Sequence, residues 1–170
     1  MTDTALTPSE ADPATLAPFE LRYLVLAAQR EGNRALGRQL APLGLTSSQF
    51  EIILVLDQYG PVSLKELGEL IVCETGSPSR IVDTLVKRGY VERTPHVKDR
   101  RALELKLTDA GRQIVPQLRE IDRVIDEGAR LLLDPADLAG LATALRMYLA
   151  GSESGAVLDR RFHGAPLAED

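Results

Sequence analysis

The sequence of 170 residues is poor in several residue types, and each shortage excludes a class of protein. It contains one cysteine, so no disulfide can form within the chain, as is typical of the reducing cytosol. Tryptophan is absent and aromatic residues make up 4%, so the core must be aliphatic, which favours helices. No apolar run approaches the roughly 18 residues of a membrane span, and the N-terminus lacks signal-peptide features. We therefore expect a cytoplasmic protein with no membrane partner.

Patterns for catalysis and metal binding are also missing. Two histidines, His96 and His163, accompany the single cysteine, which is too few for a structural zinc site. The sequence has neither a glycine-rich phosphate-binding loop nor a Gly-x-Ser-x-Gly motif, and no nucleophile has a sequence cue for a partner base. We therefore expect no enzymatic activity, no metal and no cofactor.

Charge is distributed unevenly along the chain. The net charge is −5 at pH 7, yet residues 80–101 contain seven cations and three anions. That segment therefore carries +4 and the rest of the chain −9. An acidic body with one basic patch concentrates positive potential there and suits a polyanionic partner, although charge runs are also common on solvated surfaces.

Apolar periodicity and capping signals predict a mostly helical chain. Helices are expected over residues 18–41, from Thr46 to about Tyr59, from Ser63 to about Ile71, over 77–88, from Thr108 through Leu132, and from Asp134 to about Leu149. The second and third begin with a capping box, in which Thr or Ser is followed three residues later by Gln or Glu. Residues 1–17 are expected to be a disordered N-terminal tail, and 151–170 a similar C-terminal tail.

Two short stretches beside the basic segment alternate as strands do. Residues 91–95 and 102–107 flank a charged tip, and Leu103, Leu105 and Leu107 share one face. Two helices joined by a tight glycine-containing turn and followed by a hairpin form a winged helix-turn-helix. The fold class is therefore mainly α with a small β-hairpin wing. The second helix of the pair would lie in a DNA major groove, with the hairpin tip over the backbone or minor groove.

This geometry identifies candidate DNA-binding residues in the second helix and the wing. They are Ser77, Ser79, Arg80, Thr84, Lys87, Lys98, Arg100 and Arg101. Arg80 can make a bidentate contact to guanine, and Thr84 and Lys87 suit phosphates. Arg100 and Arg101 can enter a narrow minor groove. Each serine can equally be a helix cap, and Thr84 can simply be exposed.

Four stretches carry a resemblance to a known family. LTSSQFEIILVL, LKELGELIV, SRIVDTLVKRGYVER and DRRALELKLTDAG resemble, in order and spacing, the MarR family of bacterial transcription regulators. The resemblance implies a homodimer with a helical dimerisation domain (18–45 and 108–150) and a DNA-binding winged helix-turn-helix (46–107) that reads a pseudo-palindrome. It also implies a repressor released from DNA by a small aromatic or phenolic effector.

The resemblance also assigns roles to individual residues. In the Asp-x-Arg signature of the family's wing, the aspartate orients the arginine, and this pattern matches Asp99 and Arg101. Glu74 is a second candidate partner of Arg101. Candidate effector-pocket residues on the first helix are Arg22, Tyr23 and Arg30. Solvation of the two arginines and core packing of the tyrosine are the alternatives.

Two questions stay open at the level of sequence. Cys73 precedes the second helix of the pair and is a candidate redox-sensitive thiol, although a free cysteine is commonly a small buried residue. A winged-helix dimer could also be an effector-binding or protein-interaction module that does not itself read promoters. Preference for one palindrome, together with salt dependence, would separate these functions.

Overall fold

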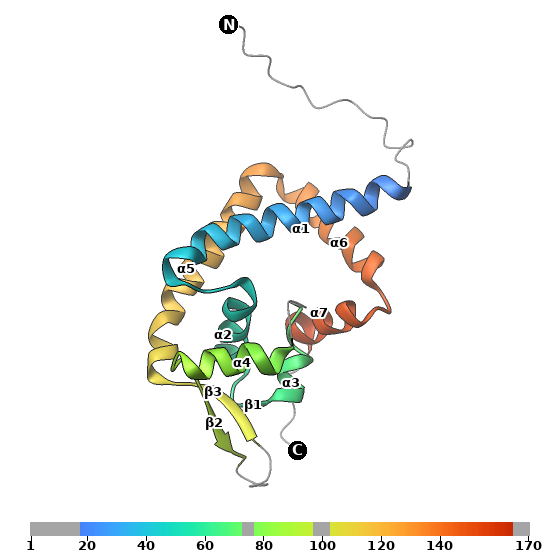
Figure 1. The fold of residues 1–170 in the computed structure, drawn as a ribbon. Helices are drawn as coiled ribbons and strands as arrows, with labels where there is room; N and C mark the ends of the chain where they lie inside the picture. Colours follow the sequence, from blue (N-terminus) through green and yellow to red (C-terminus); the bar gives the residue numbers. More distant parts are fainter. Residues whose placement is uncertain (1–17, 73–76, 97–102, 165–170) are drawn as a thin grey trace, which may run out of the picture. The chain divides into compact units, whose positions relative to one another are not determined.

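The computed structural model describes residues 18–72, 77–96 and 103–164 (Figure 1). The helices are α1 (Pro18–Leu40), the 3-10 helix η2 (Ala41–Leu43), α2 (Ser47–Tyr59), α3 (Leu64–Gly68), α4 (Pro78–Lys87), α5 (Asp109–Leu132), α6 (Pro135–Leu149) and α7 (Glu153–His163). The strands are β1 (Val62–Ser63), β2 (Val91–Pro95) and β3 (Leu103–Leu107). The chain divides into two compact units at Ala35, so most of α1 belongs to the first unit and all later elements to the second.

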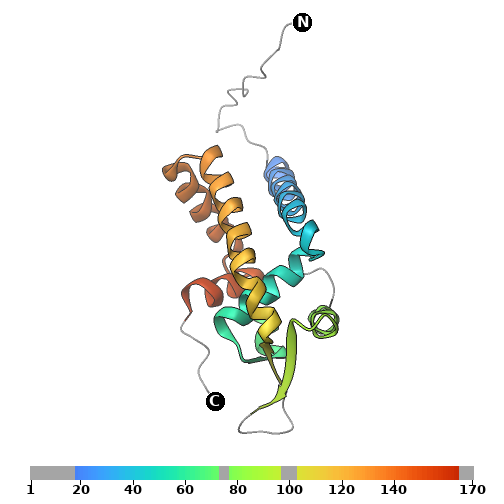
Figure 2. The same ribbon diagram turned by 90° about the vertical axis from the view of Figure 1, so that its left-hand side faces the viewer.

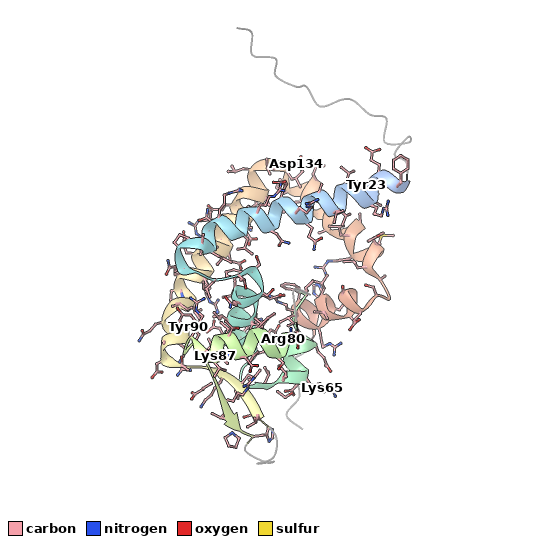
Figure 3. All side chains as sticks on the ribbon, in the orientation of Figure 1. Tyr23, Lys65, Arg80, Lys87, Tyr90 and Asp134 are labelled. Atoms are coloured by element: carbon pink, nitrogen blue, oxygen red, sulfur yellow. The ribbon has the colours of Figure 1, made fainter. Side chains whose placement is uncertain are left out.

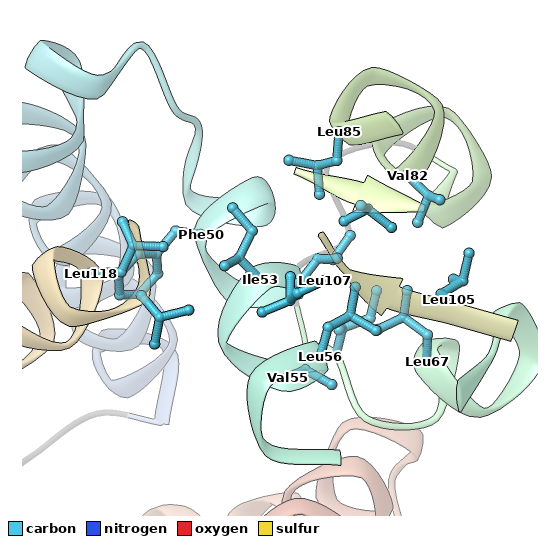
Figure 4. Packing of buried hydrophobic residues seen from close by; sticks show 14 of the residues in the cluster. Phe50, Ile53, Val55, Leu56, Leu67, Val82, Leu85, Leu105, Leu107 and Leu118 are labelled. Carbon is cyan, nitrogen blue, oxygen red and sulfur yellow. The ribbon is translucent and has the colours of Figure 1, made fainter. Parts of the chain in front are cut away.

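Helix α2 lies at the centre of the second unit. Its start is a capping box, in which the Thr46 hydroxyl accepts from the Gln49 N–H (3.3 Å) and the Thr46 N–H donates to the Gln49 side chain (3.1 Å). Apolar side chains from α2, α3, α4, α5 and β3 meet in a single buried cluster (Figure 4).

Within the described ranges no single helix is long and apolar enough to cross a membrane. One bent pair of helices, Phe19–Leu43 with Ser47–Tyr59, has the length and composition of a membrane span, and these two properties alone suggest it.

Helix α3 is shorter than predicted. The capping box at its start is present, since the Ser63 hydroxyl accepts from the Glu66 N–H (3.2 Å). The Ser63 N–H donates to the Glu66 carboxylate (2.6 Å), and hydrogen bonding of that carboxylate to the backbone and side chain of Ser63 lowers the pKa of Glu66. The helix ends at Gly68 rather than near Ile71, because a tight turn follows in which the Leu70 N–H donates to the Leu67 carbonyl (3.0 Å).

The predicted hairpin is present but belongs to a three-stranded antiparallel sheet of order β1-β3-β2. Strand β1, which was not predicted, pairs Val62 with Leu105 on the outer edge of β3. Two residues carry no periodicity, so no sequence pattern could reveal it. Leu105 and Leu107 are buried, whereas Leu103 is 52% exposed, because the apolar face of β3 extends beyond the core.

The junction between the sheet and α5 is closely packed. The Thr108 hydroxyl accepts from the Gly111 N–H (3.0 Å) and lies 2.6 Å from the Gly89 carbonyl oxygen, to which it donates. The Thr108 N–H donates to the carbonyl of Tyr90 (3.1 Å). A side chain at Gly111 would place its Cβ 2.1 Å from that same Tyr90 oxygen, so the junction requires glycine.

The C-terminal region differs from the prediction. Helix α6 begins as expected, with Asp134 Oδ1 accepting from the N–H groups of Ala136 and Asp137. The tail predicted over 151–170 is wrong for residues 153–163, which form α7 with Ser152 as its cap. The sequence left open that Val157, Leu158 and Phe162 dock on the fold, and of these Val157 is buried whereas Phe162 is 60% exposed. Most of this helix is polar, and it is held by partners far away in sequence, which periodicity cannot reveal. Residues 1–17 and 165–170 lie outside the described residues.

Substituting Gly111 by Ala is expected to lower the free energy of unfolding by about 1–3 kcal/mol, because the new Cβ must displace the Tyr90 carbonyl. Gly128→Ala in the same helix is the control. Among the described residues, nothing lies within 4 Å of its Cβ position, so helix propensity should raise stability by about 0.5–1 kcal/mol. Urea unfolding followed by circular dichroism measures both changes, and equal effects would contradict the close approach.

Candidate nucleic-acid interface

Helix α4 packs against the core through apolar residues, and its polar face is exposed. Val82 and Leu85 are fully buried, while Arg80, Thr84 and Lys87 are exposed. Pro78 occupies the first turn, where its missing N–H costs no hydrogen bond. The helix ends where Gly89 takes a left-handed conformation (φ +74°), and Arg80 and Lys87 lie along its length (Figure 3).

The candidate hydroxyl residues of α4 differ in their hydrogen bonds. Ser77 stands at the N-cap, but within the described residues its side chain makes no capping hydrogen bond. Its carbonyl accepts from the Arg80 N–H (2.9 Å), and its side chain is exposed. Ser79 is half-buried. The Thr84 hydroxyl donates to the Arg80 carbonyl (3.0 Å), which leaves its oxygen lone pairs available to a donor.

Two of the seven cations in the basic segment hold the fold through specific partners. The Arg88 guanidinium donates to the carbonyls of Gly44 (2.6 Å) and Leu43 (2.9 Å), and it lies 5.2 Å from the centroid of the Tyr90 ring. Arg93 on β2 pairs with Asp83 on α4 (2.6 Å), which links the wing to the helix. Sequence reasoning selected neither residue as a DNA contact.

Ion pairs also join the two strands of the wing. Lys106 lies 3.5 Å from Glu92, directly across the β2–β3 ladder. His96, which follows the end of β2 at Pro95, lies 3.4 Å from Glu104. Glu104 and Lys106 are two residues apart on β3, so both contacts lie on the same face of the hairpin.

Several candidate residues lie outside the described residues, so their roles stay predictions. They are Cys73, Glu74, Lys98, Asp99, Arg100 and Arg101. Lys65 on α3 is an additional exposed cation of the second unit that sequence reasoning missed (Figure 3). It stands in a helix of five residues, where the short pattern defines no outward face.

The candidate effector residues all belong to the first unit. Arg22, Tyr23 and Arg30 are exposed on α1, and the Arg22 guanidinium lies 4.8 Å from the centroid of the Tyr23 ring. Tyr23 is therefore not packed into a core of this chain. In the part of the chain that the structure describes, no group of three or more His, Cys, Asp or Glu residues could hold a metal ion.

Comparison with known proteins identifies relatives of this chain. A family model described as "MarR family" matches residues 45–103. The multiple antibiotic resistance protein MarR of Escherichia coli (strain K12) is 30% identical over 101 residues, which span 59% of this chain and 70% of that protein. The HTH-type transcriptional regulator SarZ of Staphylococcus haemolyticus is 26% identical over 118 residues, or 69% of this chain and 80% of SarZ.

Solved structures agree with these matches. A mutant of E. coli MarR complexed with operator DNA is 27% identical, with a TM-score of 0.70, over 76% of this chain and 93% of that chain. The transcriptional repressor CouR bound to a 23-mer DNA duplex is 26% identical, with a TM-score of 0.68, over 75% of this chain and 91% of that chain. Both likenesses extend well beyond the segment matched by the family model.

Arg88→Ala is expected to lower the free energy of unfolding by about 1–2 kcal/mol, because it removes two hydrogen bonds from a charged donor. Its neighbour offers a matched control, since Lys87 is exposed as Arg88 is but makes no such hydrogen bond among the described residues, and its truncation should change stability by less than about 0.5 kcal/mol. Chemical denaturation of the two variants gives the comparison. Equal free energies of unfolding would show that the hydrogen bonds of Arg88 do not stabilise the fold.

Proposed function

The chain belongs to the MarR family, and on that premise we propose that it is a homodimeric, sequence-specific DNA-binding transcriptional regulator of the bacterial cytoplasm. One observation carries the proposal: α4 is seated on the core by apolar residues and presents an exposed cationic face beside a β-wing. The likeness to two structures solved with DNA duplexes supports the same function.

Each part of this surface has a role in the proposed complex. Helix α4 enters the major groove, where Arg80 donates two hydrogen bonds to a guanine edge. Ser77 and Ser79, in the first turn, reach base edges, and Thr84 and Lys87 contact phosphates further along the helix. The −9 charge of the rest of the chain repels the duplex and so favours approach through the basic segment.

The wing completes the interface in this proposal. Lys98 and Arg100 contact the DNA backbone and minor groove, and Arg101 inserts into the minor groove where the potential is most negative. Asp99 and Glu74 orient the Arg101 guanidinium through charge-assisted hydrogen bonds. The Arg93–Asp83 pair keeps the base of the wing in register with α4, so both elements address adjacent grooves.

Apolar surface on the C-terminal helices supports the homodimer. Of the described residues, α6 buries none, although it carries Leu141 and Tyr148 on one face. Leu131 and Leu132 at the end of α5 are 87% and 84% exposed. A second copy of the chain would cover such residues, and a two-fold axis would present two copies of α4 to a pseudo-palindrome.

Regulation is proposed from the family alone. The protein would repress transcription while bound and would be released by a small aromatic or phenolic effector near Arg22, Tyr23 and Arg30. A chain with the same fold could instead bind effectors or proteins without reading promoters. Selection of bound duplexes from a pool of random sequences distinguishes the two functions.

Selection of duplexes from a random pool is expected to enrich a pseudo-palindrome with half-sites about 10 bp apart, because two recognition helices meet one face of B-form DNA. For the selected duplex, the logarithm of the binding constant should fall linearly with the logarithm of the salt concentration, with a slope of about −0.9 for each phosphate contacted. Binding without any enriched sequence would contradict the proposal and favour the interaction module.

A variant of the wing, with a matched control on α5, tests the role of Arg101 in binding. Arg101→Ala should weaken binding to the selected duplex by about 1–3 kcal/mol. Arg123→Ala removes the same charge from an exposed site on α5, where its ion pairs are to Glu120 and Glu127 of the same helix, and should bind like the wild type. Wild-type affinity in Arg101→Ala, with the dimer intact, would remove the wing from the mechanism.

Introducing charge on one face of α6 should dissociate the dimer. Leu141→Glu combined with Tyr148→Glu is expected to shift the mass measured by light scattering from dimer to monomer, because buried carboxylates without partners are costly. Thr143→Glu is the control, since Thr143 lies on the opposite face of the helix. A dimeric double variant would show that α6 is not in the interface.

A further inference from the structure

Helix α7 packs against the helix-turn-helix of its own chain. Figure 2 shows α7, in red, beside α2 and α3, in teal and green. Val157 is buried, and the Tyr59 hydroxyl of α2 donates to the Arg161 carbonyl. The helix thus contributes one apolar side chain and several polar contacts to a surface formed by earlier elements.

The central contact is an ion pair between Arg161 of α7 and Glu51 of α2. The Arg161 guanidinium lies 2.5 Å from Glu51 Oε1, and only 9% of the Glu51 side chain is exposed. The same Glu51 oxygen accepts a hydrogen bond from the Val72 N–H at 2.9 Å. Val72 lies between α3 and α4 in the sequence, so one carboxylate connects α7 to the described start of that segment.

A second ion pair reaches the other end of the described part of this segment. Arg160 lies 2.5 Å from Glu69, the C-cap residue that follows the end of α3. This pair is more exposed than the first, so solvent screens it and it contributes less. Adjacent arginines of α7 therefore contact the helix-turn-helix segment at Glu69 directly and at Val72 through Glu51.

We infer that α7 is a positioning element for the recognition helix, acting through Arg161 and Glu51 on Val72, in the described part of the segment between α3 and α4. The inference rests on the proposed function, because the position of α4 affects binding only if α4 reads DNA. A carboxylate buried this deeply requires its cation. Without Arg161, this nearly buried carboxylate would lack its cation, and the hydrogen bond that it accepts from the Val72 N–H would weaken.

The first test compares Arg161→Met with Arg123→Met, which removes the same charge from an exposed site. Hydrogen exchange of the Val72 amide, measured without DNA, should become about tenfold faster or more in Arg161→Met and stay unchanged in the control. The ratio of affinities for the selected duplex and for scrambled DNA should fall by about tenfold. Loss of overall stability alone would leave that ratio unchanged in the folded fraction. Arg161→Lys should recover part of both losses.

Unchanged Val72 exchange in Arg161→Met would overturn the inference, as would faster exchange with a wild-type affinity ratio. A wild-type protein that shows no preference for any duplex would instead overturn the proposed function. The exchange measurement remains valid in that case, so the two failures are distinguishable. Light scattering in parallel establishes that each variant remains in the same oligomeric state as the wild type.

A second variant tests whether Glu51 is the link. Glu51→Gln combined with Arg161→Met removes both charges, while the glutamine oxygen can still accept from the Val72 N–H. We expect slower Val72 exchange and a higher affinity ratio than in Arg161→Met alone. A double variant no better than the single one would show that Arg161 acts by another route and would overturn the assignment of Glu51.

Discussion

The burial of α2 is the constraint on which the second unit depends. Its apolar residues face α3, α4, α5 and β3 at once, so the placement of each of those elements follows from packing on one helix. A fully buried Leu or Ile contributes roughly 1.5–3 kcal/mol relative to an exposed one, whereas an exposed ion pair contributes at most about 1 kcal/mol. Helix α4 is therefore held mainly by apolar contacts with the core, and ion pairs such as Arg93–Asp83 contribute less.

Local signals in the sequence were sufficient for most of the fold. The capping boxes predicted at Thr46 and Ser63 are confirmed, and Thr108 and Asp134 cap the helices predicted to begin there, because a capping bond joins residues two or three apart and leaves a short pattern. Strand β1 and helix α7 were missed for the opposite reason. The first has only two residues, which pair on the edge of β3, and the second is joined to the fold through the distant residues Glu51 and Glu69, although its Ser152 cap is a local signal.

The same difference between local signals and contacts distant in sequence limited the prediction of the interface. The outward face of α4 follows from helical geometry, so the exposed positions of Arg80 and Lys87 agree with the sequence analysis. Composition could not separate cations that face outward from those that hold the fold. The +4 charge of residues 80–101 includes Arg88 and Arg93, whose partners are a pair of carbonyls and Asp83.

The contact made by Arg88 has a consequence for the evolution of this region. Its acceptors are the main-chain carbonyls of Leu43 and Gly44, and every residue type supplies such a carbonyl. Substitution of Leu43 therefore leaves the anchor intact and demands no compensating change at position 88. A search for covarying positions would find no coupling here, although the two segments are physically joined.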